Sequence, residues 1–175
     1  MQRAKSGQGV VADYFSQGYR VSGAFSEGNR ALPDVVYDLN TDYLLIRDAY
    51  LSSITDPAAI ATYYATALLA KRNLEFVLVM DQKDGLRRDQ HFTLGSHTFD
   101  LCVTVPFFEI RGRLHSQLRT FDPRAFLGSG AGPFITLLNA TARCTFDPNT
   151  SYQGGAVLIS RAAISFLGEQ ERQET

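Results

Sequence analysis

An internal repeat constrains the fold of this chain more than any other feature. Residues 67–77 and 157–167 share one pattern of apolar, aliphatic, small, basic and aromatic positions, at a separation of 90 residues. Upstream, residues 43–49 match residues 134–140 at a separation of 91. Self-similarity at a nearly constant separation is the signature of a repeated structural unit. The sequence therefore predicts two diverged copies of one unit.

Two further matches keep the same order along the chain. Asp34 corresponds to Asp122 at a separation of 88, and Val21-Ser22-Gly23 corresponds to Ile110-Arg111-Gly112 at 89. A unit of four or five short strands is too small to bury a stable core by itself. We therefore expect a mostly β fold, in which two tandem copies of a small antiparallel barrel-like or sandwich unit pack as a pseudo-dimer about a twofold axis.

The junction between the copies is expected in the segment 81–89. This run is charged and contains Gly85, which is typical of a solvated turn. The predicted organisation is a first β repeat at 1–86 and a second at 87–175, either as two units or as one fused domain.

The apolar runs of both copies predict short strands. In the first copy these are 18–26, 43–53, 63–70 and 73–80. In the second copy they are 98–110, 112–120, 133–146, 155–161 and 163–168.

One segment carries a competing signal. Asp56-Pro57 resembles a helix start, and the apolar residues of 57–71 recur at helical spacing. The matching stretch of the second copy contains Gly154-Gly155, which is poor helix material. The repeat therefore favours a helical turn at 57–61 followed by a strand.

Composition narrows the class of protein. Hydrophobic residues make up 45% and charged residues 20%, which excludes a disordered chain. The net charge of −1 gives no overall field to attract nucleic acid or an acidic membrane. Cys102 and Cys144 are expected as small core residues, with a single bridge as the alternative. No apolar run has the length of a signal peptide or a membrane span, so a cytoplasmic location is expected.

Part of each copy resembles known small β domains. The elements that carry the resemblance are Asp38-Leu39-Asn40, the run 44–49, and Lys71 followed by Leu74 and Phe76. This layout resembles uncharacterised bacterial small β domains and, more distantly, Sm-like β-barrels. The second resemblance implies an RNA-binding role for Asp38, Asn40 and Lys71, although Asn40 has no counterpart in the second copy.

A basic row is the main candidate binding surface. It consists of Arg111, Arg113, His115, Arg119 and Arg124. Alternate residues of a strand share a face, so such a row is able to contact phosphates or an acidic partner. The alternative is a solvated, salt-bridged face.

Lys71 and Arg161 occupy matching positions in the two copies. They are candidate ligand-facing residues. The favoured alternative is a structural ion pair in each copy, with Asp34 and Asp122 as the partners, because buried charges usually need a partner.

Other chemistry has little support in the sequence. His91, His97 and Asp100 are the only concrete candidates for an enzyme or metal site, and their spacing does not force them together. The Gly-rich run 128–133 lacks the lysine and the following helix of a phosphate loop. We expect no cofactor and no catalytic residues. The favoured hypothesis is a non-enzymatic structural or protein-interaction module in a larger assembly, and the alternative is a small-ligand or nucleic-acid binding domain.

Overall fold

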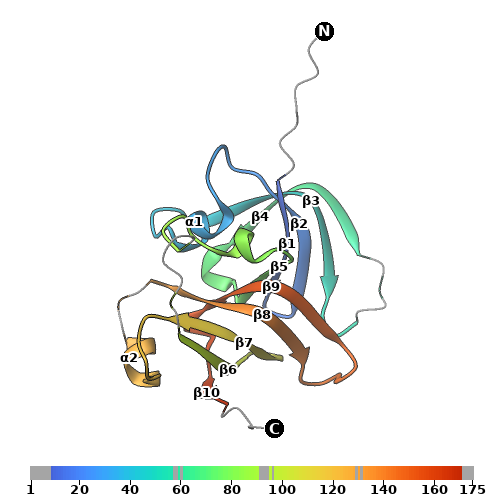
Figure 1. Ribbon diagram of the computed structural model, residues 1–175. Coiled ribbons are helices and arrows are strands. Elements are labelled where there is room, and N and C mark those ends of the chain that lie inside the picture. Colours follow the sequence, from blue (N-terminus) through green and yellow to red (C-terminus); the bar gives the residue numbers. More distant parts are fainter. Residues whose placement is uncertain are drawn as a thin grey trace.

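The computed structural model describes residues 9–56, 59, 61–90, 95, 97–128, 130 and 132–170. Within these ranges the chain forms ten antiparallel strands in one open sheet and two short α-helices (Figure 1). The strands are β1 (Val10–Ser16), β2 (Tyr19–Phe25), β3 (Tyr43–Ser53), β4 (Thr62–Ala70), β5 (Phe76–Val79), β6 (His97–Val105), β7 (Phe108–Ser116), β8 (Phe134–Cys144), β9 (Ser151–Ser160) and β10 (Phe166–Glu169). The helices are α1 (Leu32–Tyr37) and α2 (Pro123–Gly128), with short 3-10 turns η1 (Lys71–Asn73), η2 (Gln82–Gly85) and η3 (Arg161–Ala163).

The strand order across the sheet is β10-β6-β7-β8-β9-β5-β1-β2-β3-β4. The strands of the first half therefore lie together on one side, and those of the second half on the other (Figure 1). The order β5-β1-β2-β3-β4 in the first half has the same form as β10-β6-β7-β8-β9 in the second. The predicted mostly β class is confirmed.

The two halves meet where β5 pairs with β9. The pairing runs from Phe76 opposite Ile159 to Val79 opposite Ala156. A twofold axis would bring the same strand of each half to this seam, whereas the fifth strand of one half here meets the fourth strand of the other. The pseudo-dimer expectation is therefore corrected, because the halves join head to tail through unlike strands.

Two hydrophobic cores lie on opposite faces of the central strands. On β9, Leu158 belongs to one core and Val157 and Ile159 to the other. On β5, Val77 belongs to the same core as Leu158, and Phe76 belongs to the other core, because successive side chains of a strand point to opposite faces. β5 and the last five residues of β9 are buried throughout. The halves thus share apolar surface that neither would cover alone.

Corresponding bends occur in both halves of the sheet. The β2–β3 pairing shifts register at Gly23, and the β7–β8 pairing shifts register at Gly112. A Cβ at Gly23 would lie 2.5 Å from Ile46 Cγ2, and one at Gly112 would lie 2.9 Å from Leu137 Cβ. Glycine allows the neighbouring strand to approach at each bulge.

Most predicted strands are observed with small shifts of their ends. The segment 62–70 is strand rather than helix, because it pairs with β3 over eight residue pairs; the turn expected at 57–61 falls largely outside the described residues. The predicted strand 98–110 ends earlier, and a tight turn at Pro106-Phe107 leads into β7. β1 was not predicted, although its counterpart β6 was.

The two α-helices were not predicted either. Pro33 lies in the first turn of α1, where its missing N–H costs nothing. Asp122 precedes α2, and its Oδ1 accepts hydrogen bonds from the backbone N–H of Arg124 at 2.9 Å and of Ala125 at 3.2 Å. These six-residue helices are too short for an amphipathic pattern to reveal them.

Both cysteines are free, and Cys144 is buried in the core as expected, while Cys102 is partly exposed. Among the described residues, no helix has both the length and the apolar character needed to cross a membrane.

Candidate functional site

The basic row is divided by the fold. Arg111 and Arg113 lie half-exposed on β7, and each contacts an acid: Arg111 Nε donates to Glu109 Oε1 at 2.8 Å, and Arg113 Nε lies 3.4 Å from Asp100 Oδ1. Arg143 adds a second contact to Glu109 at 3.3 Å. This part of the row is a salt-bridged face.

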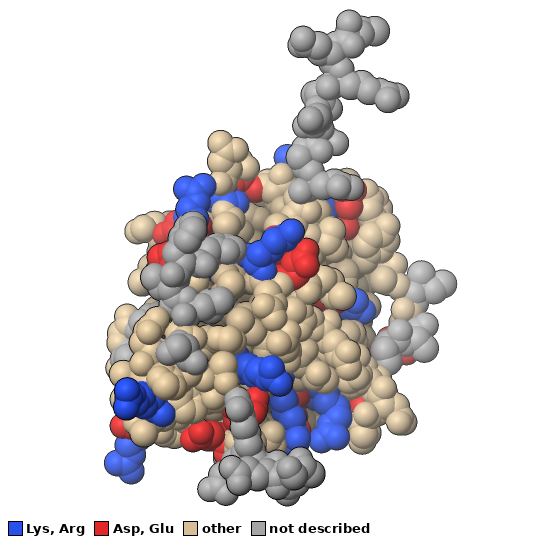
Figure 2. Space-filling model, in the orientation of Figure 1, with Lys and Arg blue, Asp and Glu red and all other residues tan. Residues whose placement is uncertain are grey.

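The remaining members of the row lie elsewhere. Arg119 follows β7 in a bend, Arg124 lies on α2, and His115 lines a pocket between the halves. β7 ends at Ser116, so Arg119 and Arg124 lie beyond the strand whose alternation would have kept the row on one face. Figure 2 shows that the Lys and Arg side chains of the visible face are scattered, with Asp and Glu among them.

Lys71 and Arg161 have equivalent structural roles, but not the predicted ones. Lys71 Nζ donates to the carbonyls of Val35 and Asp38 at the end of α1, and to Thr41 Oγ1. Arg161 Nη1 donates to the carbonyls of Phe126, at 2.6 Å, and Leu127, at 3.1 Å, at the end of α2.

The acids predicted as partners of these cations have other positions. Asp34 lies in the first turn of α1, and Asp122 caps the start of α2. Each cation therefore contacts carbonyls at the C-terminal end of a helix, which suits the negative end of the helix dipole. The Val35 carbonyl also accepts a hydrogen bond from the Asp38 N–H at 3.3 Å.

The residues of the Sm-like resemblance lie close together at the end of α1. Asp38 Oδ1 accepts hydrogen bonds from the backbone N–H of Asn40 at 2.9 Å and from its side-chain amide at 3.0 Å, and Oδ2 accepts one from Arg30 at 2.7 Å. The Asn40 N–H and Arg30 lower the pKa of Asp38. Burial lowers the pKa of Lys71. These side chains are occupied with interactions inside the fold.

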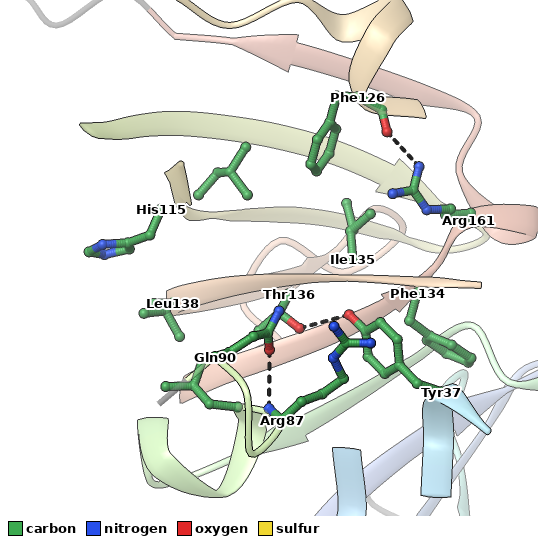
Figure 3. Close-up of a pocket in the computed structure, with 12 residues that line it drawn as sticks. Tyr37, Arg87, Gln90, His115, Phe126, Phe134, Ile135, Thr136, Leu138 and Arg161 are labelled. Atoms are coloured by element: carbon green, nitrogen blue, oxygen red, sulfur yellow. Dashed lines mark hydrogen bonds between the residues drawn. The ribbon is translucent and has the colours of Figure 1, made fainter. Parts of the chain in front are cut away.

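A pocket of about 220 Å³ opens at the seam between the halves (Figure 3). The first half contributes Tyr37 and Leu86. The second half contributes Arg87 and Gln90, which follow η2, together with Thr136, Arg161 and apolar residues. Figure 3 shows Arg87 beside Tyr37 and Thr136, and Arg161 beside Phe126.

Two guanidinium groups give this pocket its electrostatic character. Arg87 lies 4.8 Å from the centre of the Tyr37 ring and forms an ion pair with Asp89 at 2.8 Å, and Arg161 lies 5.4 Å from the centre of the Phe126 ring. Within the described part of the chain, the buried Nε–H groups of Arg87 and Arg161 have no hydrogen-bond partner. Burial raises the pKa of Tyr37, whose hydroxyl lies 3.0 Å from Thr136 Oγ1. The pocket is thus suited to a small anion.

A second pocket of about 460 Å³ has both Lys71 and Arg161 in its lining. The repeat had indicated this pair, and the structure brings the two together at the seam. Both side chains remain directed to the carbonyls of their helices.

A third hollow is an apolar groove of about 420 Å³ in the first half. Its lining comes from the β1–β2 turn, β2, β3 and β4, and includes Tyr19, Tyr64 and Leu68, which are exposed. At the opposite end of the sheet, Phe166 on β10 is 55% exposed. These residues were not predicted as a site from the sequence, although the sequence pattern aligns Leu68 with Leu158 and Phe166 with Phe76.

The described residues form no metal site around the candidate histidines. His97 begins β6 opposite Ser116, and Asp100 lies opposite Arg113, while His91 falls outside the described residues. No group of three or more His, Cys, Asp or Glu side chains that could hold a metal is found in the described ranges.

These features define the class as a mostly β protein built on one open antiparallel sheet, with a polar pocket at its seam and apolar side chains at its two edges. Comparisons with protein-family models, with curated proteins and with solved structures found no match to the chain.

Proposed function

We propose that this chain is a non-enzymatic interaction module that works as a subunit of a larger assembly. We further propose that it consists of two diverged copies of one five-stranded unit, residues 1–86 and 87–175. The observation that carries the functional proposal is the apolar character of both open sheet edges. Leu68 on β4 is 68% exposed and Phe166 on β10 is 55% exposed. Open edges with apolar side chains are sites of strand pairing with another chain.

Several observations support the two-copy proposal. The strand order, the bulges opposite Gly23 and Gly112, and the carbonyl-binding cations recur in both halves. The left-handed residues Asp48 and Asn139, both at φ 49°, also lie at matching positions of β3 and β8. Such features depend on local backbone geometry, so their recurrence favours a common origin for the halves.

The native size of the protein tests the functional proposal. In an extract of the source cells, we expect the protein to elute in size-exclusion chromatography well above its monomer mass of 19.4 kDa. The double substitution Leu68→Arg and Phe166→Arg should reduce that mass, and Leu118→Arg, at an exposed position away from the edges, should not. Elution of the native protein as a free monomer would contradict the proposal.

A second candidate function is the binding of a small anion in the seam pocket. The unpartnered Nε–H groups of Arg87 and Arg161 favour it. Guanidinium groups bind phosphate and carboxylate strongly when they are shielded from water. Of the predicted basic row, only His115 lines this pocket, so the seam is a better place for a ligand than the Arg111–Arg124 face.

Calorimetric titration with inorganic phosphate and with pyrophosphate tests this candidate. Binding should weaken at least tenfold in Arg87→Gln and persist in Arg111→Gln with Arg113→Gln. The reverse pattern would assign the ligand, or a nucleic acid, to the basic row. No heat of binding at low ionic strength would exclude this candidate function.

A further inference from the structure

We propose that copies of this chain assemble head to tail, with β10 of one chain pairing with β4 of the next. The pairing would repeat, between molecules, the way β5 pairs with β9 inside the chain. This inference rests on the proposed function and specifies its partner as a second copy of the same protein.

The internal seam provides the template. Val77 lies opposite Leu158, and both side chains are fully buried. Across the seam, the ring of Phe76 packs edge-on against that of Phe108, with centroids 5.1 Å apart, and Phe15 contacts Phe108 at 5.0 Å. The seam therefore combines strand pairing with an aromatic cluster in a dry core.

The free edges carry the counterparts of the seam strands. β4 holds the same place in the first half as β9 holds in the second, and β10 corresponds to β5. Leu158 and Phe76 are 0% exposed, whereas their counterparts 90 positions away, Leu68 and Phe166, are 68% and 55% exposed. The side chains that join the halves thus have apolar equivalents where no neighbour covers them.

The apolar groove of the first half corresponds to a space that is filled in the second half. Phe108 and Ile110 of β7 pack in one core with Phe76, which comes from the other half. Their counterparts in β2 are Tyr19 and Val21, and both line the open groove of about 420 Å³. Phe166 of a neighbouring chain, as the counterpart of Phe76, would enter this groove.

At both the seam and the proposed junction, one strand carries a small residue where the other carries a large one. At the seam, Leu78 lies so close to Gly154 that a Cβ there would be 2.9 Å from Leu78 Cγ. Gly168 of β10 corresponds to Leu78, and Tyr64 of β4 corresponds to Gly154. At the proposed junction the large residue therefore lies on the counterpart of the strand that carries the small residue at the seam. A small residue on one side and a large one on the other preserve the packed volume.

The same glycines set the extent of the proposed pairing. A Cβ at Gly154 or Gly155 would lie 2.5 Å from the carbonyl oxygen of Val79 or Met80. Tyr64 and Ala65 hold these positions in β4, so the two chains must diverge there. The expected register places Phe166 opposite Leu69, Leu167 opposite Leu68 and Gly168 opposite Ala67.

This junction joins unlike edges, and each chain has one of each. A heterologous contact of this kind generates either a closed ring or an open filament, according to the rotation between neighbours. It also has a diagnostic property: a chain with one damaged edge retains the other edge intact.

Mixing two edge variants tests the arrangement in purified full-length protein. By analytical ultracentrifugation, we expect the wild type to form species of at least twice the 19.4-kDa monomer mass. Leu68→Arg and Phe166→Arg should each be monomeric, with circular dichroism like that of the wild type. Their equimolar mixture should form dimers, because one undamaged β4 edge meets one undamaged β10 edge. Leu118→Arg should assemble like the wild type.

Cysteine crosslinking tests the register. In a Cys102→Ser background, Leu68→Cys with Leu167→Cys should form an intermolecular disulfide, because directly opposed residues of antiparallel strands lie within disulfide distance. Leu69→Cys with Leu167→Cys should crosslink far less, because a shift of one residue places the two thiols on opposite faces.

Each other result overturns the proposal. A variant mixture that stays monomeric while the wild type assembles indicates a symmetric interface. A purified wild type that is monomeric at every concentration excludes self-assembly. In that case a high native mass in the cell extract would still support the functional proposal, with a different protein as the partner.

Discussion

At the residue scale, Lys71 contacts backbone carbonyls and Thr41 rather than the Asp34 carboxylate that the sequence had indicated as its partner. The sequence indicated that Lys71 and Arg161 stabilise their own copies, but an ion-pair argument considers only charged side chains. The carbonyls at the ends of α1 and α2 are the actual partners. Since neither short helix was predicted from the sequence, its terminal carbonyls were not considered as partners.

Replacement of Lys71 tests this role. Lys71→Met should lower the free energy of unfolding by about 1–3 kcal/mol, because the partly buried carbonyls of Val35 and Asp38 would lose a charged donor. Lys83→Met is the matched control, since Lys83 is exposed and should change stability by less than about 0.5 kcal/mol. Urea denaturation measures both. Equal effects of the two substitutions would contradict the carbonyl-binding role.

Glu75 is the buried acid whose titration should affect stability. Its Oε1 accepts a hydrogen bond from the Gln17 N–H at 3.1 Å, and its buried Oε2 has no partner among the described residues. Burial raises the pKa of Glu75 above the ordinary value of 4.5. The folded state therefore favours the protonated form. The stability linked to Glu75 is full below pH 4.5 and is lost as the pH rises through the folded-state pKa.

Glu75→Gln should remove this pH dependence. Relative to the wild type, the variant should become more stable as the pH is raised from about 4 to about 7, because the amide cannot ionise. Urea denaturation of both proteins at the two pH values measures the effect. A difference in stability that stays constant across this range would show that Glu75 does not titrate as inferred.

At the element scale, β3 and β8 each contain a bulge, and the bulges lie opposite Gly23 of β2 and Gly112 of β7. Gly23 is the tighter of the two, because a Cβ there would meet both Ile46 Cγ2, at 2.5 Å, and the Arg47 carbonyl oxygen, at 2.9 Å. The match of Gly23 with Gly112 was visible in the sequence, but its cause was not. Only the neighbouring strand explains why both positions exclude a side chain.

Gly23→Ala should therefore destabilise the protein by about 1–3 kcal/mol, because β3 would have to move away from β2. Gly128→Ala is the control, since no atom lies within 4 Å of a Cβ at that position. Chemical denaturation of the two variants gives the comparison. If Gly23→Ala is as stable as Gly128→Ala, the close approach of β3 does not matter for folding.

The strand β4 shows where strand pairing outweighs a local helical pattern. Read alone, 57–71 has helical spacing, but the residues of β4 pair with β3 as their counterparts in β9 pair with β8. Ladder hydrogen bonds and the packing of Ala67 and Leu69 on the core outweigh helix propensity here. The same comparison would have located β1, whose counterpart β6 has a clear alternating pattern.

At the scale of the whole molecule, Leu158 at the seam and Leu68 at the open edge should differ in their contribution to the free energy of unfolding. Leu158→Ala should cost about 2–5 kcal/mol, because Leu158 is 0% exposed at the seam. Leu68→Ala, at the counterpart on β4, should cost less than about 0.5 kcal/mol in the monomer. Denaturation at low protein concentration separates folding from assembly. A similar loss for both variants would contradict the described difference between seam and edge.

The sequence by itself determined the strand-rich class and most strand positions, because these depend on local patterns of apolar and small residues. It also indicated Lys71 and Arg161 as a matched pair. Only the tertiary structure decided that the halves join through β5 and β9, that the basic row is divided, and that the seam pocket contains Arg87. These properties depend on which strand edge meets which, and strand pairing between distant segments leaves no periodic signal in the chain.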